Sequence, residues 1–173
     1  MSARENILAR IRQKSGRDGM TSEAELMLVR EHMARHERGP LPSMAMREPV
    51  QHFIDECARL KTTTAEVAAL ADVPAEVARY LAAQGLAPRC VGWHQFSSLD
   101  WPAAGMQFDD RIASGDDMVG FTGCFCAIGE TGTLLLLGAP GTPKATALLP
   151  ETHICVVSKA RIDATMEDAF DRM

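Results

Sequence analysis

The spacing of hydrophobic residues predicts helices in the first third of the chain. Apolar positions recur every three or four residues there, which is typical of helices with one apolar face. Ser2 is followed three residues later by Glu5, the pattern of a capping box, so we expect a helix that ends near Ser15. A second helix is expected after Thr21 or Ser22, and a third over 47–60.

Beyond residue 60, the apolar residues gather in short continuous runs, which are typical of strands buried on both faces. Strands are expected at 62–68, 89–93, 116–121, 134–137 and 154–157. Helices are expected after Asp72 and over 163–173, and a covered loop over 95–114. Of the strands, the leucine run Leu134–Leu137 is the best candidate for the centre of a sheet. This alternation predicts an α/β fold with a Rossmann-like, mostly parallel sheet and flanking helices.

A break in the pattern at Gly39–Ser43 (GPLPS) is the best candidate for a linker, because glycine and proline interrupt regular structure. We therefore expect an N-terminal helical arm and linker over 1–43 and an α/β domain over 44–173. At 173 residues, the chain is long enough for one domain with a sizeable core.

The charge distribution argues against nucleic acid as a partner. The net charge is −5, but residues 1–61 carry 11 basic and 9 acidic residues, whereas residues 62–173 carry 7 and 14. The acidic C-terminal part is unsuited to follow a phosphate backbone. The N-terminal basic residues are interleaved with acids, which indicates a solvated helix face. A homo-oligomer is compatible with this composition.

The sequence predicts a cytoplasmic protein with free thiols. It holds no apolar stretch of transmembrane length, and its charged, amphipathic N-terminus is not a secretory signal. The cysteines are odd in number and form no Cys-x-x-Cys pair. Cys124 and Cys126 would share one face of a strand, so a redox or metal role and a role as small buried side chains both stay open. No metal site and no cofactor bound by this chain are expected.

The strongest candidate site lies within residues 119–138. Glu130 stands between two glycines just before the leucine run, where an α/β protein places binding or chemistry. Glu130 is the candidate catalytic residue; the alternative is an acid that accepts hydrogen bonds from the amides of Gly132 and Thr133. The candidate ligand-binding residues, suited to a small anion, are Thr122, Gly123, Thr131, Gly132, Thr133 and Lys144.

Each of these side chains also has a structural interpretation. The threonines could serve as strand formers and caps, and Lys144 as a solvated lysine. His153 could titrate near neutral pH or be a core histidine.

Residues 119–162 resemble the lactate utilisation protein C family (LutC/YkgG, LUD domain). The resemblance rests on a Thr-Gly pair, an Ile-x-Glu-Thr-Gly-Thr run, an apolar strand, a Pro-Gly loop, a Leu-Leu-Pro turn, a histidine and a valine-rich strand. In this sequence these are Thr122-Gly123, Ile128–Thr133, Leu134–Leu137, Ala139–Gly141, Leu148–Pro150, His153 and Ile154–Val157. The match is weaker over 46–93.

This resemblance implies a fold similar to the ribose-5-phosphate isomerase and CoA-transferase superfamily. It also implies a component of a system that oxidises L-lactate to pyruvate with iron–sulfur partner proteins. This chain has no cysteine set for a cluster of its own, so the clusters are expected in the partners. A non-catalytic accessory or ligand-binding subunit is one interpretation. The alternative is a stand-alone enzyme, like a CoA transferase or a sugar-phosphate isomerase, that uses Glu130.

Two departures from the family pattern stand out. Gly129 occupies a position where the family usually has alanine. Family members also continue with a Ser-Gly-Pro-Ser-x-Thr-Ala-Asp-Ile-Glu segment and a final strand, so we expect the C-terminal end of the family domain to be missing from this sequence.

Overall fold

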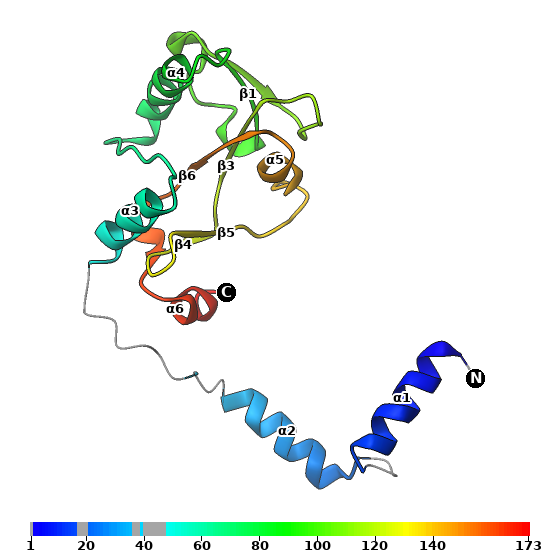
Figure 1. Ribbon diagram of the computed structural model, residues 1–173. Coiled ribbons are helices and arrows are strands. Elements are labelled where there is room, and N and C mark those ends of the chain that lie inside the picture. The colour runs from blue at the N-terminus through cyan, green and yellow to red at the C-terminus, as the bar shows by residue number, and fades with distance from the viewer. Residues whose placement is uncertain (1, 17–20, 36–38, 40–47) are drawn as a thin grey trace. The chain divides into compact units, whose positions relative to one another are not determined.

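The computed structural model describes residues 2–16, 21–35, 39 and 48–173. The chain divides into two compact units, residues 1–43 and 44–173 (Figure 1). No helix among the described residues is long and apolar enough to cross a membrane.

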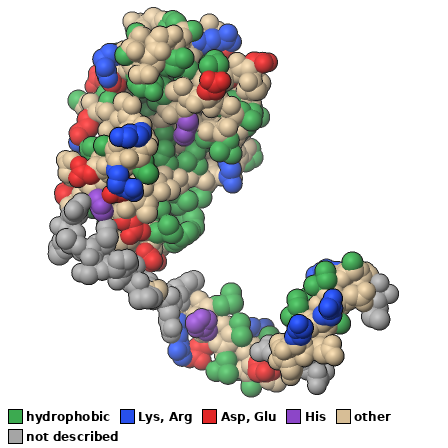
Figure 2. All heavy atoms as spheres, in the orientation of Figure 1, with side chains coloured by type: hydrophobic (Ala, Val, Ile, Leu, Met, Phe, Trp, Pro, Cys, Tyr) green, Lys and Arg blue, Asp and Glu red, His purple; other side chains and the backbone are tan. Residues whose placement is uncertain are grey.

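The N-terminal unit holds two helices, α1 (Ala3–Lys14) and α2 (Glu23–Arg35). The predicted capping box is confirmed, since the Ser2 amide donates to Glu5 Oε2 at 2.6 Å. The Ser22 amide donates to Glu25 Oε2 at 2.8 Å in the same way. Neither helix buries a residue, and Figure 2 shows hydrophobic side chains along both. Local capping, rather than packing, is therefore what favours these helices.

The main unit is built on a four-stranded sheet in the order β2-β1-β3-β6, in which every pair is parallel. Its strands are β1 (Arg89–Gly92), β2 (Gln107–Asp110), β3 (Val119–Gly123) and β6 (Thr152–Val156). The predicted α/β fold with a mostly parallel sheet is thus confirmed. The chain passes from β1 to β2 on one side and then crosses to β3 on the other. The carboxyl ends of β1 and β3 therefore form a topological switch point, where such sheets bind ligands.

The two faces of this sheet are covered differently (Figure 1). On one face, Phe121 is fully buried and its ring meets Trp101 edge-on, with centroids 5.0 Å apart. Helix α4 (Val73–Ala83) contributes Val77 and Leu81 to this aromatic core. Neighbouring strand residues point to opposite faces, so Gly120 faces the other side, where the short helix α5 (Ala145–Leu148) lies against it.

A second, smaller sheet has the order β5-β4-β7. Its strands are β5 (Thr133–Leu135), β4 (Cys126–Ile128) and β7 (Ile162–Asp163). Helix α3 (Pro49–Arg59) packs on Ala127, and α6 (Met166–Asp171) packs on the neighbouring residues Cys126 and Ile128. Figure 1 shows these two helices on opposite sides of β4. The remaining 3₁₀ helices are η1 (Leu70–Asp72), η2 (His94–Phe96), η3 (Pro102–Ala104) and η4 (Lys159–Arg161).

The leucine run is not the central strand that its composition suggested. It forms the edge strand β5, and Leu137 beyond it is 42% exposed. Every residue is buried in β3 and in β4 instead. Leu134, Leu135 and Leu136 each pack against a different cluster: the α3 cluster, the α6 cluster and the aromatic core, respectively. Three separate cores, rather than burial on both sides, explain why the run is apolar.

Other expected elements differ in extent. The strand expected at 62–68 is wrong: these residues are exposed and lie outside both sheets, because their β-branched threonines have no neighbouring strand to pair with. Strand β2 falls inside the expected loop 95–114; as an edge strand of mixed polarity, it lacks an apolar run. The strand expected at 116–121 begins only at Val119. The helix expected over 163–173 is β7 followed by α6.

Candidate functional site

A cluster of polar side chains lies on the α5 face of the main sheet, where β3 and β6 pair. The parallel register sets Thr122 opposite Cys155 and Gly120 opposite His153. Thr122 is fully buried, and its Oγ1 lies 2.7 Å from His153 Nε2. Thr122, which the sequence predicted to bind a ligand, thus forms a hydrogen-bonded pair with His153, for which the sequence left a titrating and a core role open.

Helix α5 covers this face because Gly120 has no side chain. A Cβ at Gly120 would stand 2.0 Å from the carbonyl oxygen of Thr146 in α5. Thr146 is itself fully buried, and its Oγ1 has no hydrogen-bond partner. A buried hydroxyl without a partner is costly, so this face of the sheet keeps a hydrogen-bonding group unused.

Burial sets the protonation of the histidine. It lowers the pKa of His153 below the usual value for histidine, because removal from water disfavours the charged ring. The imidazole is therefore neutral at neutral pH and can offer one donor and one acceptor. Together with the Thr122 hydroxyl, it suits hydrogen bonding to a small polar or anionic molecule more than ion pairing.

Two thiols belong to the same cluster. Cys124 follows the end of β3, whereas Cys126 lies in β4 and is fully buried, so the expectation that these two share a strand face is wrong. The chain leaves the first sheet between them. Cys124 instead lies near Cys155 of β6, whose thiol donates to the Val156 carbonyl oxygen, and both cysteines are half-buried.

The Glu130 turn has a different environment. Glu130 Oε1 accepts a hydrogen bond from the Met166 amide at 2.9 Å, at the start of α6. The turn is further tied to the β7–α6 corner, because the Gly129 and Glu130 amides donate to the Asp163 and Ala164 carbonyls at 2.7 and 3.1 Å. The carboxylate thus serves as an acceptor for a helix start, although the partner is not one of the amides expected from the sequence.

The rest of this turn also makes structural contacts. Gly132 has φ +64°, and a Cβ there would lie 3.1 Å from Glu56 Cβ in α3. Thr131 Oγ1 donates to Thr133 Oγ1 at 2.9 Å. The glycine is therefore required both by its left-handed backbone and by the close approach of α3.

Lys144 is exposed and directly precedes α5. Its aliphatic stem lies over Gly138, where a Cβ would stand 2.5 Å from Lys144 Cε. Gly123, by contrast, adjoins Thr122 in β3 but faces the opposite side of the sheet, where a Cβ would lie 3.1 Å from Gln95 Nε2 and from Phe96 Cζ. Thr122 and Gly123 therefore belong to the main sheet. The described hydrogen bonds do not join them to Glu130, Thr131, Gly132, Thr133 or Lys144.

A second polar pair at the carboxyl edge was missed by the sequence reasoning. His94 Nδ1 lies 2.6 Å from Asp110 Oδ2, just beyond β1 and at the end of β2. Both side chains are exposed. Residues that directly follow neighbouring parallel strands are candidates for a site, so the position of His94 and Asp110 could have indicated the pair. It did not, because the sequence pattern did not predict strand β2.

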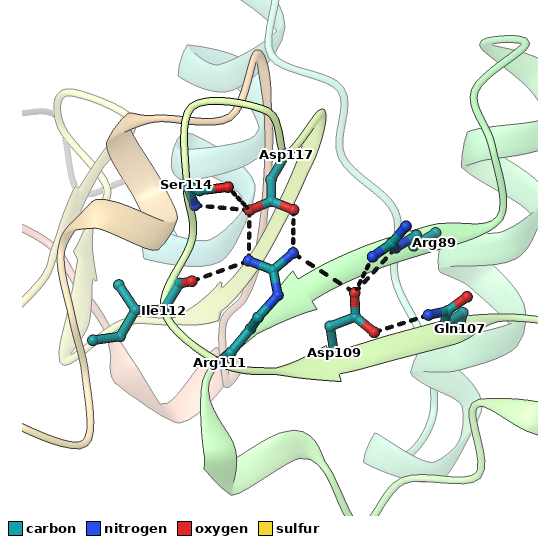
Figure 3. A network of polar contacts seen from close by, with 7 residues as sticks. All are labelled: Arg89, Gln107, Asp109, Arg111, Ile112, Ser114 and Asp117. Atoms are coloured by element: carbon teal, nitrogen blue, oxygen red, sulfur yellow. Dashed lines mark hydrogen bonds and ion pairs between the residues drawn. The ribbon is translucent and has the colours of Figure 1, made fainter.

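An ion-pair network secures the connection between β2 and β3 (Figure 3). Arg111 binds both oxygens of Asp117, and Ser114 donates to the same carboxylate through its amide and hydroxyl. The Arg111 guanidinium holds the pKa of Asp117 well below its usual range. Arg89 binds Asp109 beside this pair. The network orders the segment that leads into β3, and so it positions the polar cluster indirectly.

The described residues offer no metal site, and a hollow lies beside β2. They hold no group of three His, Cys, Asp or Glu side chains that could bind a metal ion. A hollow of about 360 Å³ borders β2, and none of the predicted site residues lines it. Its lining residues are Ser97, Leu99, Trp101, Pro102, Met106, Gln107 and Phe108.

Comparisons with known proteins point to one domain family. Residues 94–173 match the model of the LUD domain. An uncharacterized protein of Neisseria meningitidis serogroup B is 37% identical over 52 residues, which cover 30% of this chain and 22% of that protein. The matched stretch thus spans about a fifth of the relative's length. No solved structure matches the chain.

Proposed function

We propose that this chain acts in an L-lactate utilisation system, because residues 94–173 match the LUD domain, which resembles that of lactate utilisation proteins. In such a system L-lactate is oxidised to pyruvate, and we place this chain in the cytoplasm as an accessory or ligand-binding subunit beside iron–sulfur partner proteins. The observation that carries the proposal is the domain match, which spans β2, β3, β6 and the polar cluster.

The distribution of cysteines supports a role for partners in electron transfer. A four-cysteine cluster needs its thiolates at one point. Among the described residues, Cys124 and Cys155 lie near each other, whereas Cys57 lies in α3 and Cys90 in β1. Electrons from L-lactate would therefore pass through clusters held by other proteins.

We place the ligand at the pair Thr122–His153, with Gly123 beside it. Thr122 lies next to the carboxyl end of β3, whereas His153 lies near the start of the neighbouring strand β6. The neutral imidazole and the hydroxyl can bind the carboxylate and hydroxyl oxygens of a small acid such as L-lactate. The unused hydroxyl of Thr146 lies under the same helix and offers a further hydrogen bond. Glu130 is already engaged with α6, which favours a structural role for it over catalysis.

The first test is affinity capture of the full chain from its own host grown on L-lactate, with an absorbance spectrum of the eluate. The expected result is a brown eluate that contains iron–sulfur proteins and is absent from cells grown without L-lactate. A colourless eluate with this chain alone would contradict the partner part of the proposal.

Ligand binding is tested separately by calorimetry with L-lactate and pyruvate. His153→Gln should weaken binding by about tenfold or more, as expected for loss of a hydrogen-bonding side chain. His94→Gln is the matched control, since His94 is exposed and pairs with Asp110. Equal affinity in both variants would argue against this site.

The purified chain also tests the alternative, a stand-alone enzyme that uses Glu130. If the chain is such an enzyme, a CoA ester or a sugar phosphate should raise its melting temperature in a thermal-shift screen, and Glu130→Gln should abolish turnover. No single contact of Glu130 favours this alternative over the capping role.

A further inference from the structure

The two edge strands of the main sheet differ in how well they are protected against pairing with another chain. Strand β2 carries Asp109 and Asp110, and Arg111 follows it. Charged side chains on an edge strand hinder the approach of another strand. Strand β6, over Thr152–Val156, contains no Asp, Glu, Lys, Arg or Pro, and three of its five residues are β-branched. The edge at β6 therefore lacks the protection that β2 has, and its composition favours pairing.

The backbone of β6 keeps hydrogen-bonding groups on its outer side. The Thr152 amide donates to the Met118 carbonyl oxygen at 3.0 Å, so the backbone groups of Thr152 face β3. Successive residues of a strand turn these groups to alternate sides, which directs those of His153, Cys155 and Val157 outward. Within the described ranges, β6 pairs with β3 alone, and no backbone hydrogen bond reaches these outward groups. The edge can therefore accept a further strand.

Charge and backbone conformation select how a second copy of β6 would fit this edge. The backbone is still extended at Ser158, and η4 begins at Lys159. An antiparallel pair centred on Cys155 sets Thr152 opposite Ser158 of the second copy, so the whole extended stretch is paired. The same register sets the exposed Glu151 opposite the exposed Lys159 in both directions. A shift by two residues toward either end would leave part of the stretch unpaired and would separate these charges.

Exposed apolar side chains flank both ends of the strand. Leu148 and Leu149 precede β6 and are 77% and 51% exposed. At the other end, Glu66 forms an ion pair with Lys159, which brings the exposed Val67 close to the end of β6. Antiparallel pairing sets the first end of one copy beside the second end of the other. The leucines and Val67 would then leave water together, which favours association.

From these observations we propose that β6 is a self-association surface, through which two copies of this chain pair antiparallel about a two-fold axis at Cys155. The two four-stranded sheets then continue into one another. Backbone hydrogen bonds hold the two strands together, and the two Glu151–Lys159 pairs fix the register. This surface goes beyond the proposed function, because it needs neither L-lactate nor another protein.

The mass of the full chain in solution, measured by light scattering after size exclusion, tests the pairing. We expect twice the mass of one chain, with dissociation on dilution. Glu151→Lys sets a lysine opposite Lys159 and should weaken the dimer about tenfold, because two ion pairs become two repulsions. Asp110→Lys is the matched control, since it reverses an exposed charge on the opposite edge of the same sheet and should leave the dimer unchanged.

The reverse change tests whether the two charges meet. Lys159→Glu alone should also weaken the dimer, and it breaks the pair with Glu66 as well. If Glu151 and Lys159 face each other across the interface, adding Glu151→Lys to Lys159→Glu should tighten the dimer again.

A disulfide tests the register. Thr152→Cys with Ser158→Cys sets two thiols opposite each other at a non-hydrogen-bonded pair, where the Cα atoms of antiparallel strands lie about 4.5 Å apart. Mild oxidation should then give a covalent dimer whose digest contains a peptide that links positions 152 and 158. Thr152→Cys alone is the control, because position 152 does not lie opposite itself and should form no such link.

The wild-type mass decides the proposal even if a variant fails to fold, and circular dichroism checks the folding of each variant. A monomer at every concentration would overturn the proposal, as would a species larger than a dimer. So would a dimer that Glu151→Lys leaves unchanged, or a disulfide between positions that this register keeps apart.

Discussion

The two ends of the stretch 119–138 differ in what their polar groups contact. At the first end, Thr122 on β3 meets His153 and Cys155 on the neighbouring strand, so side chains face side chains. At the second end, Glu130 and Gly129 bind the backbone of the β7–α6 corner. The stretch 119–138 therefore includes part of a polar cluster at one end and, at the other, a turn that is bonded to a helix start. Motif residues that are adjacent in sequence do not have to share a site.

The largest loss of stability should come from a side chain added between β3 and α5. Gly120→Ala places a Cβ where the Thr146 carbonyl oxygen lies 2.0 Å away, so we expect the free energy of unfolding to fall by about 3 kcal/mol. Gly115→Ala is the matched control, because a Cβ at Gly115 meets nothing within 4 Å. Chemical denaturation of both variants measures the difference. Similar stabilities would show that α5 is not held against β3 at this point.

The two buried threonines should respond in opposite directions. Thr122→Val removes the partner of His153 and should cost about 1.5 kcal/mol, whereas Thr146→Val removes an unpaired buried hydroxyl and should stabilise the chain by about 1 kcal/mol. Urea unfolding of the two variants with the wild type gives both signs. A loss of stability in Thr146→Val would mean that its hydroxyl has a partner in solution, such as a bound water.

The turn should show its role as a helix cap. Glu130→Ala removes the acceptor of the Met166 amide, so the free energy of unfolding should fall by about 1 kcal/mol. The exposed Asp116→Ala serves as a control. Thermal unfolding measures the stability of each variant, and a separate assay measures L-lactate oxidation by the captured complex. If Glu130→Ala keeps the full stability of the wild type but loses L-lactate oxidation, Glu130 takes part in the chemistry and is not mainly a helix cap.

The smallest effect concerns acid. Arg111 lowers the pKa of Asp117 in the folded chain, so this carboxylate stabilises the fold above about pH 4, and the contribution is lost as the pH falls through the lowered folded value. The stability difference between wild type and Asp117→Asn should therefore be largest near neutral pH and should shrink below pH of about 4. Asp116→Asn, whose carboxylate makes none of the described hydrogen bonds, is the control. A difference that does not change with pH would contradict this account.

Much of the fold could be predicted from local patterns. The capping box at Ser2, the helix after Asp72 and the strand that begins at Arg89 depend on neighbouring residues and were placed within a few positions. Strand β2 was missed because an edge strand buries little and needs no apolar run. The leucine run was misplaced because composition reports burial but not which core a side chain enters.

The candidate site divides in the same way. Thr122 and Gly123 were named from the sequence, but their partners come from β6, about thirty residues away, where Cys155 drew attention only as one of five cysteines. The expected pair Cys124 and Cys126 was wrong, since two residues between two sheets are enough to send the thiols to different cores. The domain division at residue 43 and the likeness to the CoA-transferase superfamily stay predictions.

The sequence by itself determined the class of fold and the N-terminal helices with their caps, because propensity, periodicity and capping act over a few residues. Only the tertiary structure decided which polar groups meet. The register between β3 and β6 brings Thr122, His153 and Cys155 together, and the corner between β7 and α6 takes up Glu130. Contacts between distant segments depend on strand order and register, and a local pattern carries no record of either.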